Sequence, residues 1–228
     1  MTRIKAANGT IPVFGPASAP HFDDVFRSQL LDLFKWRRDV RRFRADPVPP
    51  AVLQGLLDVA NLAPSVGLSQ PWRFVIVDSP NRRAAVRASF AACNECALDN
   101  QDHDRRARYT RLKLAGLDEA PCHLAVFAEP DPEQGHGLGR GTMPETTTYS
   151  AVMAVHTLWL AARALGLGLG WVSILDPLTV TAALDVPANW QFVGYFCLGY
   201  PQTDSEVPEL EQAGWEHRSP ATSRVLRR

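Results

Sequence analysis

The sequence has no excess of charge of either sign, because 24 lysine and arginine residues balance 24 aspartate and glutamate residues. A chain without net charge has no general attraction to nucleic acid or to an anionic membrane surface. Long apolar runs are also missing. The most apolar stretch, 151–165, is interrupted by His156 and Arg163, whereas a membrane-spanning helix needs roughly 18 consecutive apolar residues. We therefore expect neither nucleic acid nor a membrane as a partner.

Cysteine is scarce, and four residues are too few for a disulfide scaffold in a chain of 228 residues. Cys93 and Cys96 have the spacing of metal ligands, but no second Cys-x-x-Cys pair and no following histidine pair accompanies them. The six histidines are scattered, and we expect His156, inside a helical pattern, to be a core residue rather than a ligand. The sequence thus predicts reduced thiols and no metal site.

The chain also lacks an internal linker rich in proline and serine, so we expect one domain over residues 1–228. Residues 1–22 contain no continuous apolar segment of signal-peptide length, which predicts a loose N-terminal arm and a cytoplasmic protein. Residues 202–228 are polar and are expected to form an extended tail that packs on a neighbouring subunit.

One apolar helix dominates what the sequence does contain. Apolar residues recur at helical spacing over 151–165, and Met153 and Leu160 fill the other faces, so we expect the helix to be surrounded by protein. Thr142 and Glu145 have the spacing of a capping box before it. Gly166 is expected to end it, and a buried strand is expected over 169–175.

Shorter patterns predict further elements on both sides of this helix. The spacing of apolar residues predicts helices over 22–36, 51–62, 80–97 and 177–184. Strands are expected over 73–77, 122–128 and 191–198. The charged segment 99–111 has no apolar stripe, and its composition fits an exposed connector as well as a mobile cover.

Two segments carry candidate binding groups. Residues 37–44 set five arginines around Asp39. Such a run fits a solvated helix C-terminus, where the helix dipole stabilises cations. Guanidinium groups are also the usual partners of phosphate, and both interpretations stay open. The loop 63–72 combines small residues with Ser65, Gln70 and Trp72, and close backbone approach at Gly67 suits a planar polar ligand.

These segments, in this order, resemble the FMN-dependent nitroreductase-like family. The matching landmarks are Arg37-Arg38-x-x-Arg41, Ala63-Pro64-Ser65 with Gln70-Pro71-Trp72, Gly168-x-Gly170-Trp171 and Leu198-Gly199-Tyr200-Pro201. The resemblance implies an α+β fold in which helices flank a mixed, mainly antiparallel sheet around a long central helix. It also implies a homodimer with FMN at the subunit interface.

Two departures from the general pattern narrow the resemblance. Asp39 stands where most members carry serine or threonine, and Gly67-Leu68 stands where asparagine is usual. With residues 112–114 and Ser173, these features are similar to a branch of the family in aerobic cobalamin biosynthesis. Its members use no metal and consume reduced FMN as a substrate with O2, giving 5,6-dimethylbenzimidazole, the lower ligand of vitamin B12, and erythrose 4-phosphate.

The resemblance assigns roles to individual residues. Asp39 and Ser173 match the catalytic pair, and a carboxylate fixed beside the flavin can act as a general base or proton relay. A hydroxyl at Ser173 can orient the flavin by hydrogen bonding. Arg105 and Lys113 would belong to a lid that also excludes a nicotinamide, so a separate flavin reductase would supply reduced FMN. The implied flavin contacts are Arg37, Arg38, Asp39, Val40, Arg41, Ser65, Gln70, Arg105, Lys113, Gly170, Trp171 and Ser173.

Two other functions stay open. An NAD(P)H-dependent nitro- or quinone reductase of the same fold would oxidise NAD(P)H and recycle the flavin intact. A non-catalytic FMN carrier would bind FMN tightly and leave its mass unchanged after reduction and exposure to air. NAD(P)H oxidation and flavin consumption together discriminate among the three functions.

Overall fold

The protein is described by a computed structural model that covers residues 3–6, 9–12, 19–99, 116–220, 224–226 and 228. Its centre is a four-stranded sheet of β3 (Trp72–Ile76), β4 (Cys122–Ala128), β6 (Gln191–Gly199) and β5 (Gly168–Val172). The strand order is β3-β4-β6-β5, and each neighbouring pair is antiparallel. This arrangement confirms the expected α+β fold. The sheet, expected to be mixed and mainly antiparallel, has only antiparallel pairs among its four described strands.

The strand predictions succeed best where the strand is fully buried. Every residue of β4 is buried, and a strand covered on both faces is a continuous apolar run. The predicted end of β5 is wrong, because the strand stops at Val172 and not at residue 175. Leu175 is still buried, but there the chain has left the sheet towards α7 (Pro177–Leu184), which begins after its N-cap Asp176.

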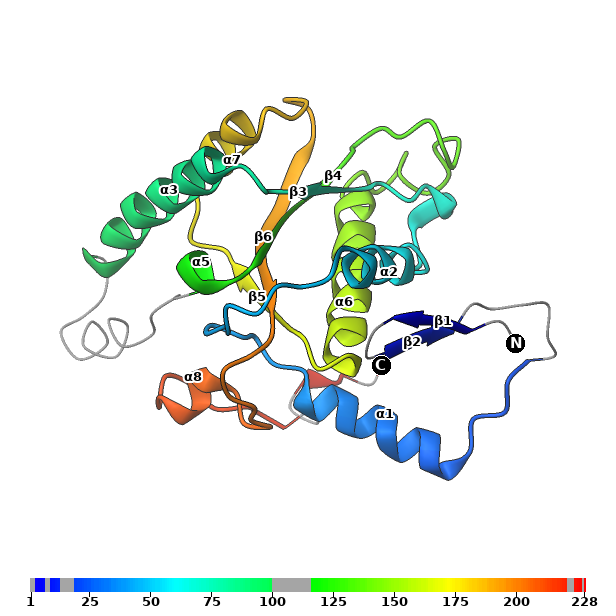
Figure 1. Cartoon of the computed structure of the whole chain (residues 1–228). Coiled ribbons are helices and arrows are strands. Elements are labelled where there is room, and N and C mark those ends of the chain that lie inside the picture. The colour runs from blue at the N-terminus through cyan, green and yellow to red at the C-terminus, as the bar shows by residue number, and fades with distance from the viewer. Residues whose placement is uncertain (1–2, 7–8, 13–18, 100–115, 221–223, 227) are drawn as a thin grey trace.

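The central helix α6 (Thr146–Ala164) packs on one face of the sheet (Figure 1). Small residues such as Ala151 and Ala154 are fully buried and allow a close approach. The expectation of a helix surrounded by protein is wrong for the single chain, because Tyr149 is 56% and Met153 45% exposed. His156 lies on the same exposed stripe and is not a core residue. The sheet and α2 cover only the opposite side of α6.

The two ends of α6 give different outcomes. The predicted capping box is wrong, since α6 begins after Glu145 and no side chain caps it. The prediction for Gly166 is confirmed. Its φ is +75°, and its N–H donates to the Arg163 carbonyl at 3.0 Å, as expected for a glycine that ends a helix.

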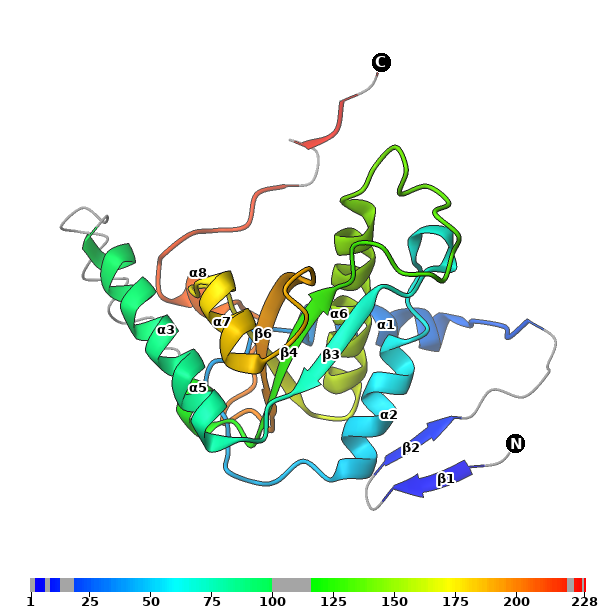
Figure 2. The same cartoon turned by 90° about the horizontal axis from the view of Figure 1, so that it is seen from above.

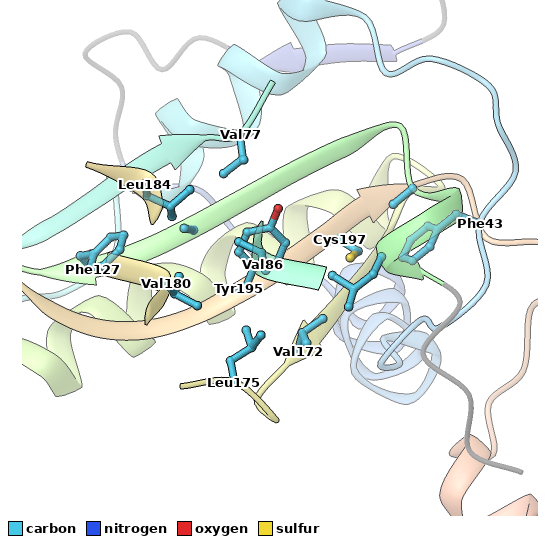
Figure 3. Close-up of a cluster of buried hydrophobic side chains, with 13 residues drawn as sticks. Phe43, Val77, Val86, Phe127, Val172, Leu175, Val180, Leu184, Tyr195 and Cys197 are labelled. Atoms are coloured by element: carbon cyan, nitrogen blue, oxygen red, sulfur yellow. The ribbon is translucent and has the colours of Figure 1, made fainter. Parts of the chain in front are cut away.

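Helices cover both faces of the sheet (Figure 2). On the α6 face lie α2 (Pro50–Ala60) and, across the end of α6, α1 (Asp24–Trp36). On the other face lie α3 (Pro80–Asp99), α5 (Gly116–Glu119) and α7. Figure 3 shows the core beneath them, in which Val86, Val180 and Leu184 from these helices meet Phe127 and Tyr195 from the strands. A short 3-10 turn, Val66–Leu68, precedes β3.

The terminal segments pack little against this core. β1 (Arg3–Ala6) and β2 (Gly9–Pro12) form an antiparallel hairpin. In the tail, residues 202–212 include α8 (Glu209–Gln212) and contact the rest of the chain, for example through an Arg163–Asp204 ion pair of 2.5 Å. Packing on a partner thus stays a prediction for the remainder of the tail. Among the described helices, none combines the length and the apolar character that a membrane crossing requires.

Candidate functional site

The arginine segment extends the free edge of the sheet beside β5. Asp39 forms a parallel bridge with Leu169, and the Val40 N–H donates to the Leu169 carbonyl at 3.0 Å. Gly170 makes this approach possible, because a Cβ there would lie 2.1 Å from the Val40 carbonyl oxygen. At Gly168 a Cβ would lie 2.5 Å from Val40 Cγ2. The Gly-x-Gly pattern therefore serves close packing of the arginine segment against the strand.

The Asp39 carboxylate is held at two points. Oδ1 accepts the Trp171 backbone N–H at 2.8 Å, and Oδ2 lies 3.5 Å from Arg41 Nε. Burial raises the pKa of Asp39 above its usual value, while the Trp171 hydrogen bond and Arg41 act in the opposite direction. The net shift brings its titration closer to neutral pH, which suits a group that accepts and returns a proton.

The arginines of the cluster have different partners. The Arg37 guanidinium lies 4.9 Å from the centre of the Trp159 ring, and it makes no hydrogen bond to another described residue. Its N–H groups are therefore available to an anion. Arg38 turns the other way, donating from Nε to the Glu206 carbonyl at 2.7 Å and from Nη1 to the Arg37 carbonyl at 2.6 Å. Arg41, only 12% exposed, remains beside Asp39.

Ser173 lies close in the chain to Trp171, the partner of Asp39, but does not contact Asp39 itself. It follows the end of β5 by one residue and is exposed. Trp171, which binds Asp39, precedes it by two residues, or roughly 7 Å of extended chain. In the described part of one subunit, the hydroxyl of Ser173 makes no hydrogen bond to Asp39.

Ser65 and Gln70 belong to a second polar group, in the loop before β3. Ser65 Oγ accepts the Gln70 backbone N–H at 3.1 Å. The Gln70 side chain donates to Asn61 Oδ1 at 3.2 Å and accepts from Gln134 at 3.0 Å. Asn61 also accepts the Trp72 indole N–H at 3.1 Å. Sequence reasoning missed Asn61 and Gln134; Asn61 falls inside the predicted helix 51–62, whereas the observed α2 ends at Ala60 and leaves Asn61 in the loop.

The single chain does not bring the two groups together. The Ser65 loop is attached near the start of α6, where Val66 N–H donates to Ser150 Oγ at 3.0 Å. The arginine segment is attached nearer the other end, where Trp159 Nε1 donates to the Arg38 carbonyl at 3.1 Å. These attachments are nine residues apart, which is roughly 13 Å along a helix. They also belong to opposite edges of the sheet, β3 and β5.

Two expected contacts, Arg105 and Lys113, lie outside the described residues. Within the described ranges, no three histidine, cysteine, aspartate or glutamate side chains gather where they could hold a metal ion.

A buried titratable pair lies away from the site, between β4 and β6. His123 Nδ1 is 2.8 Å from the Tyr195 hydroxyl, and both residues are buried. Burial lowers the pKa of His123 to about 4 and raises that of Tyr195. Sequence reasoning did not single out this pair, because the residue types within two strands do not reveal which side chains meet across the sheet.

Comparison with known proteins gives one family and close relatives. The model of the nitroreductase family matches residues 34–200. A 5,6-dimethylbenzimidazole synthase of Rhodospirillum rubrum is 58% identical over 203 residues, covering 89% of this chain and 96% of that protein. Another from Rhodobacter capsulatus is 48% identical, covering 88% and 97%. The structure is similar to that of iodotyrosine deiodinase bound to FMN and 3-iodo-L-tyrosine, with a TM-score of 0.66 and 29% identity over 77% of this chain and 91% of that chain.

Proposed function

Since the chain belongs to the nitroreductase family, we propose that it is a 5,6-dimethylbenzimidazole synthase, like the relatives that it matches over almost their whole length. The observation that carries this proposal is the 58% identity with the Rhodospirillum rubrum synthase. The geometry agrees with it, because the residue that departs from the general family pattern, Asp39, is a carboxylate fixed by the Trp171 N–H beside Arg41.

Reduced FMN and O2 are the substrates in this proposal. The flavin supplies the carbon atoms of both 5,6-dimethylbenzimidazole and erythrose 4-phosphate, and the remainder of its ring system leaves as a further fragment. The donor set of the site fits its phosphate, because the Arg37 and Arg41 guanidinium groups present several N–H donors at the edge of the sheet. Arg38 supports the segment through Glu206 and contributes its charge nearby.

Asp39 is the proposed proton acceptor. Dividing the flavin requires removal of a proton from the ribityl arm, and a carboxylate with a raised pKa can take up that proton and return it. The Trp171 N–H fixes one carboxylate oxygen, which leaves the other for the substrate or for Arg41. Ser173, just beyond β5, is the proposed hydroxyl that orients the flavin.

We further propose that the active protein is a homodimer. No residue of α1 is buried, and Val25, Phe26, Leu31 and Phe34 are 40–64% exposed. Together with Tyr149 and Met153 on α6, these side chains leave an apolar surface that a second subunit would cover. A dimer would also join the loop group of one subunit to the arginine group of the other at a shared FMN site. A monomeric mass by light scattering at micromolar concentration would contradict this.

The test of function follows the flavin itself. Purified protein is mixed anaerobically with chemically reduced FMN, air is admitted, and the small molecules are measured by mass spectrometry. The synthase is expected to form dimethylbenzimidazole without NAD(P)H, whereas intact FMN as the sole flavin product would refute the proposal. Adding NADPH together with a flavin reductase should sustain turnover, because we propose that a separate enzyme supplies the reduced flavin.

The Asp39→Asn variant tests the proposed base. Asparagine keeps an oxygen for the Trp171 N–H but loses the proton-accepting carboxylate. Binding of reduced FMN should persist, while product formation falls by roughly 10²- to 10⁴-fold. Asp46→Asn is the matched control, because this exposed carboxylate pairs only with Arg44 at 3.3 Å in the described structure. Full activity of Asp39→Asn would show that Asp39 is not the base.

A further inference from the structure

Phe43 occupies a special position at the end of the arginine segment. Antiparallel pairing joins this segment to the strand that follows β6, with bonds from Arg44 N–H to the Tyr200 carbonyl at 2.8 Å and from Gln202 N–H to the Arg42 carbonyl at 3.1 Å. Phe43 faces Pro201 between these two bonds. In such a pair the N–H and carbonyl of the middle residue point away from the neighbouring strand. The backbone of Phe43 therefore needs partners elsewhere.

Two side chains supply those partners. Glu119 Oε2 accepts the Phe43 N–H at 3.2 Å, and Gln202 Nε2 donates to the Phe43 carbonyl at 2.9 Å. The same amide donates to Glu119 Oε2 at 3.2 Å, so the Phe43 backbone, Glu119 and Gln202 form one closed set of hydrogen bonds. It joins three chain segments: the arginine segment, α5 and the residues after β6.

The Phe43 ring is fixed at the same point. It is 1% exposed, and it lies against two glycines at which a side chain would collide with it. A Cβ at Gly116 would be 2.8 Å from the ring, and one at Gly199 would be 3.2 Å from it. Ring and backbone of Phe43 are thus both held, while Asp39, four residues earlier, is held by β5. The chain between these two anchors contains Arg41.

We propose that Glu119 and Gln202 are positioning residues for the reaction, because through Phe43 they fix the segment that presents Asp39 and Arg41 to the flavin. The inference rests on the proposed function for its link to turnover. Its physical reason is that a buried backbone group without a partner is costly, so loss of the Glu119 oxygen drives the segment to rearrange. A displacement of about 1 Å at a reacting group can lower turnover roughly 100-fold.

A series at Glu119 separates the hydrogen bonds from the charge. Glu119→Gln keeps an oxygen that can accept both N–H groups, whereas Glu119→Ala removes it. We expect Glu119→Ala to lower kcat roughly 10- to 100-fold and to change KM for reduced FMN less, because Arg37, held on Trp159, lies outside the displaced stretch. Glu119→Gln should stay near wild type. The matched control is Asp118→Ala, which removes the neighbouring acid, an Arg87 partner at 2.8 Å, without touching Phe43.

A second measurement does not depend on turnover. Hydrogen–deuterium exchange of a peptide spanning residues 38–45 should accelerate in Glu119→Ala and Gln202→Ala, and should stay at the wild-type rate in Glu119→Gln and Asp118→Ala. All assays are run well below the melting temperature of each variant, so that unfolding does not contribute.

The outcomes separate the two proposals. Wild-type kcat and exchange in Glu119→Ala would overturn the positioning role, as would equal damage by Glu119→Gln or by Asp118→Ala. A wild-type protein that forms no product would refute the proposed function. The exchange series alone would then decide whether Glu119 and Gln202 hold the segment.

Discussion

Gly170→Ala should separate the arginine segment from β5. The added Cβ would lie 2.1 Å from the Val40 carbonyl oxygen, whereas real Cβ contacts essentially never fall below 3.0 Å. The two chains would therefore have to move apart by at least about 0.9 Å. Such a shift stretches the Val40–Leu169 and Trp171–Asp39 hydrogen bonds, which hold the carboxylate in place.

The size of the effect follows from the contact. Overpacking of this kind costs about 1–3 kcal/mol, and each kcal/mol lowers Tm by about 2–4 °C in a chain of this length. Because Asp39 moves with Val40, turnover should fall roughly 100-fold, more than the stability loss explains. The assays are a thermal melt and product formation from reduced FMN, measured on the same preparation.

Matched variants test whether the backbone contact is the cause. At Gly168 the added Cβ meets Val40 Cγ2 at 2.5 Å and Val40 Cβ at 2.9 Å, so Val40→Ala removes the shortest contact and should restore the Gly168→Ala variant in part. The same second change should not restore Gly170→Ala, since its collision is with the Val40 backbone oxygen. Gly141→Ala, with nothing within 4 Å, should behave as wild type. Normal turnover in Gly170→Ala, or rescue of both double variants, would refute the reasoning.

Three further predictions concern titration and helix termination. His123 has a pKa of about 4 in the folded state and about 6.5 in the unfolded state. Between these pH values the unfolded state therefore binds more protons, and the free energy of unfolding should fall by about 3 kcal/mol as pH drops from about 6.5 to about 4. In His123→Gln the free energy of unfolding should depend less on pH over the same range. If Asp39 is the base, kcat should fall on the acid side of its pH profile with a midpoint above the ordinary pKa of an aspartate. A midpoint at the ordinary aspartate pKa would count against this role. Gly166→Ala should cost about 1 kcal/mol because of its φ of +75°, leaving kcat unchanged in the turnover assay.

The sequence predicted the elements whose pattern is decided locally or by complete burial. β4 matches its predicted range, and Gly166 ends α6 as expected, because burial on both faces and a left-handed φ each leave a direct signal in residue type. The exposed side of α6 was not predictable in this way. An apolar residue such as Met153 has the same signature whether its cover is its own chain or a second subunit.

The candidate site was predicted as a set of residue types and not as a geometry. Asp39 was singled out as an acid among arginines, and its role in the reaction stays a prediction. Its partner, the Trp171 N–H, is a backbone group 132 residues away. Asn61, Gln134, Glu119 and Gln202 were not found, since each acts on a neighbour that only the fold brings close. Composition carries no information about such backbone partners.

The arginine cluster shows why the choice between a solvated charge run and an anion site stayed open from the sequence. The five arginines lie within eight residues of one another, yet their N–H groups have different partners in the fold. Arg38 is already bound to the Glu206 carbonyl, and Arg44 pairs with Asp46 at the surface. Arg37 stacks on Trp159 with its N–H groups unbound among the described residues, and Arg41 stays beside Asp39. Because binding depends on donors that folding leaves unused, the solvated run describes Arg44, whereas an anion site at Arg37 and Arg41 stays a prediction.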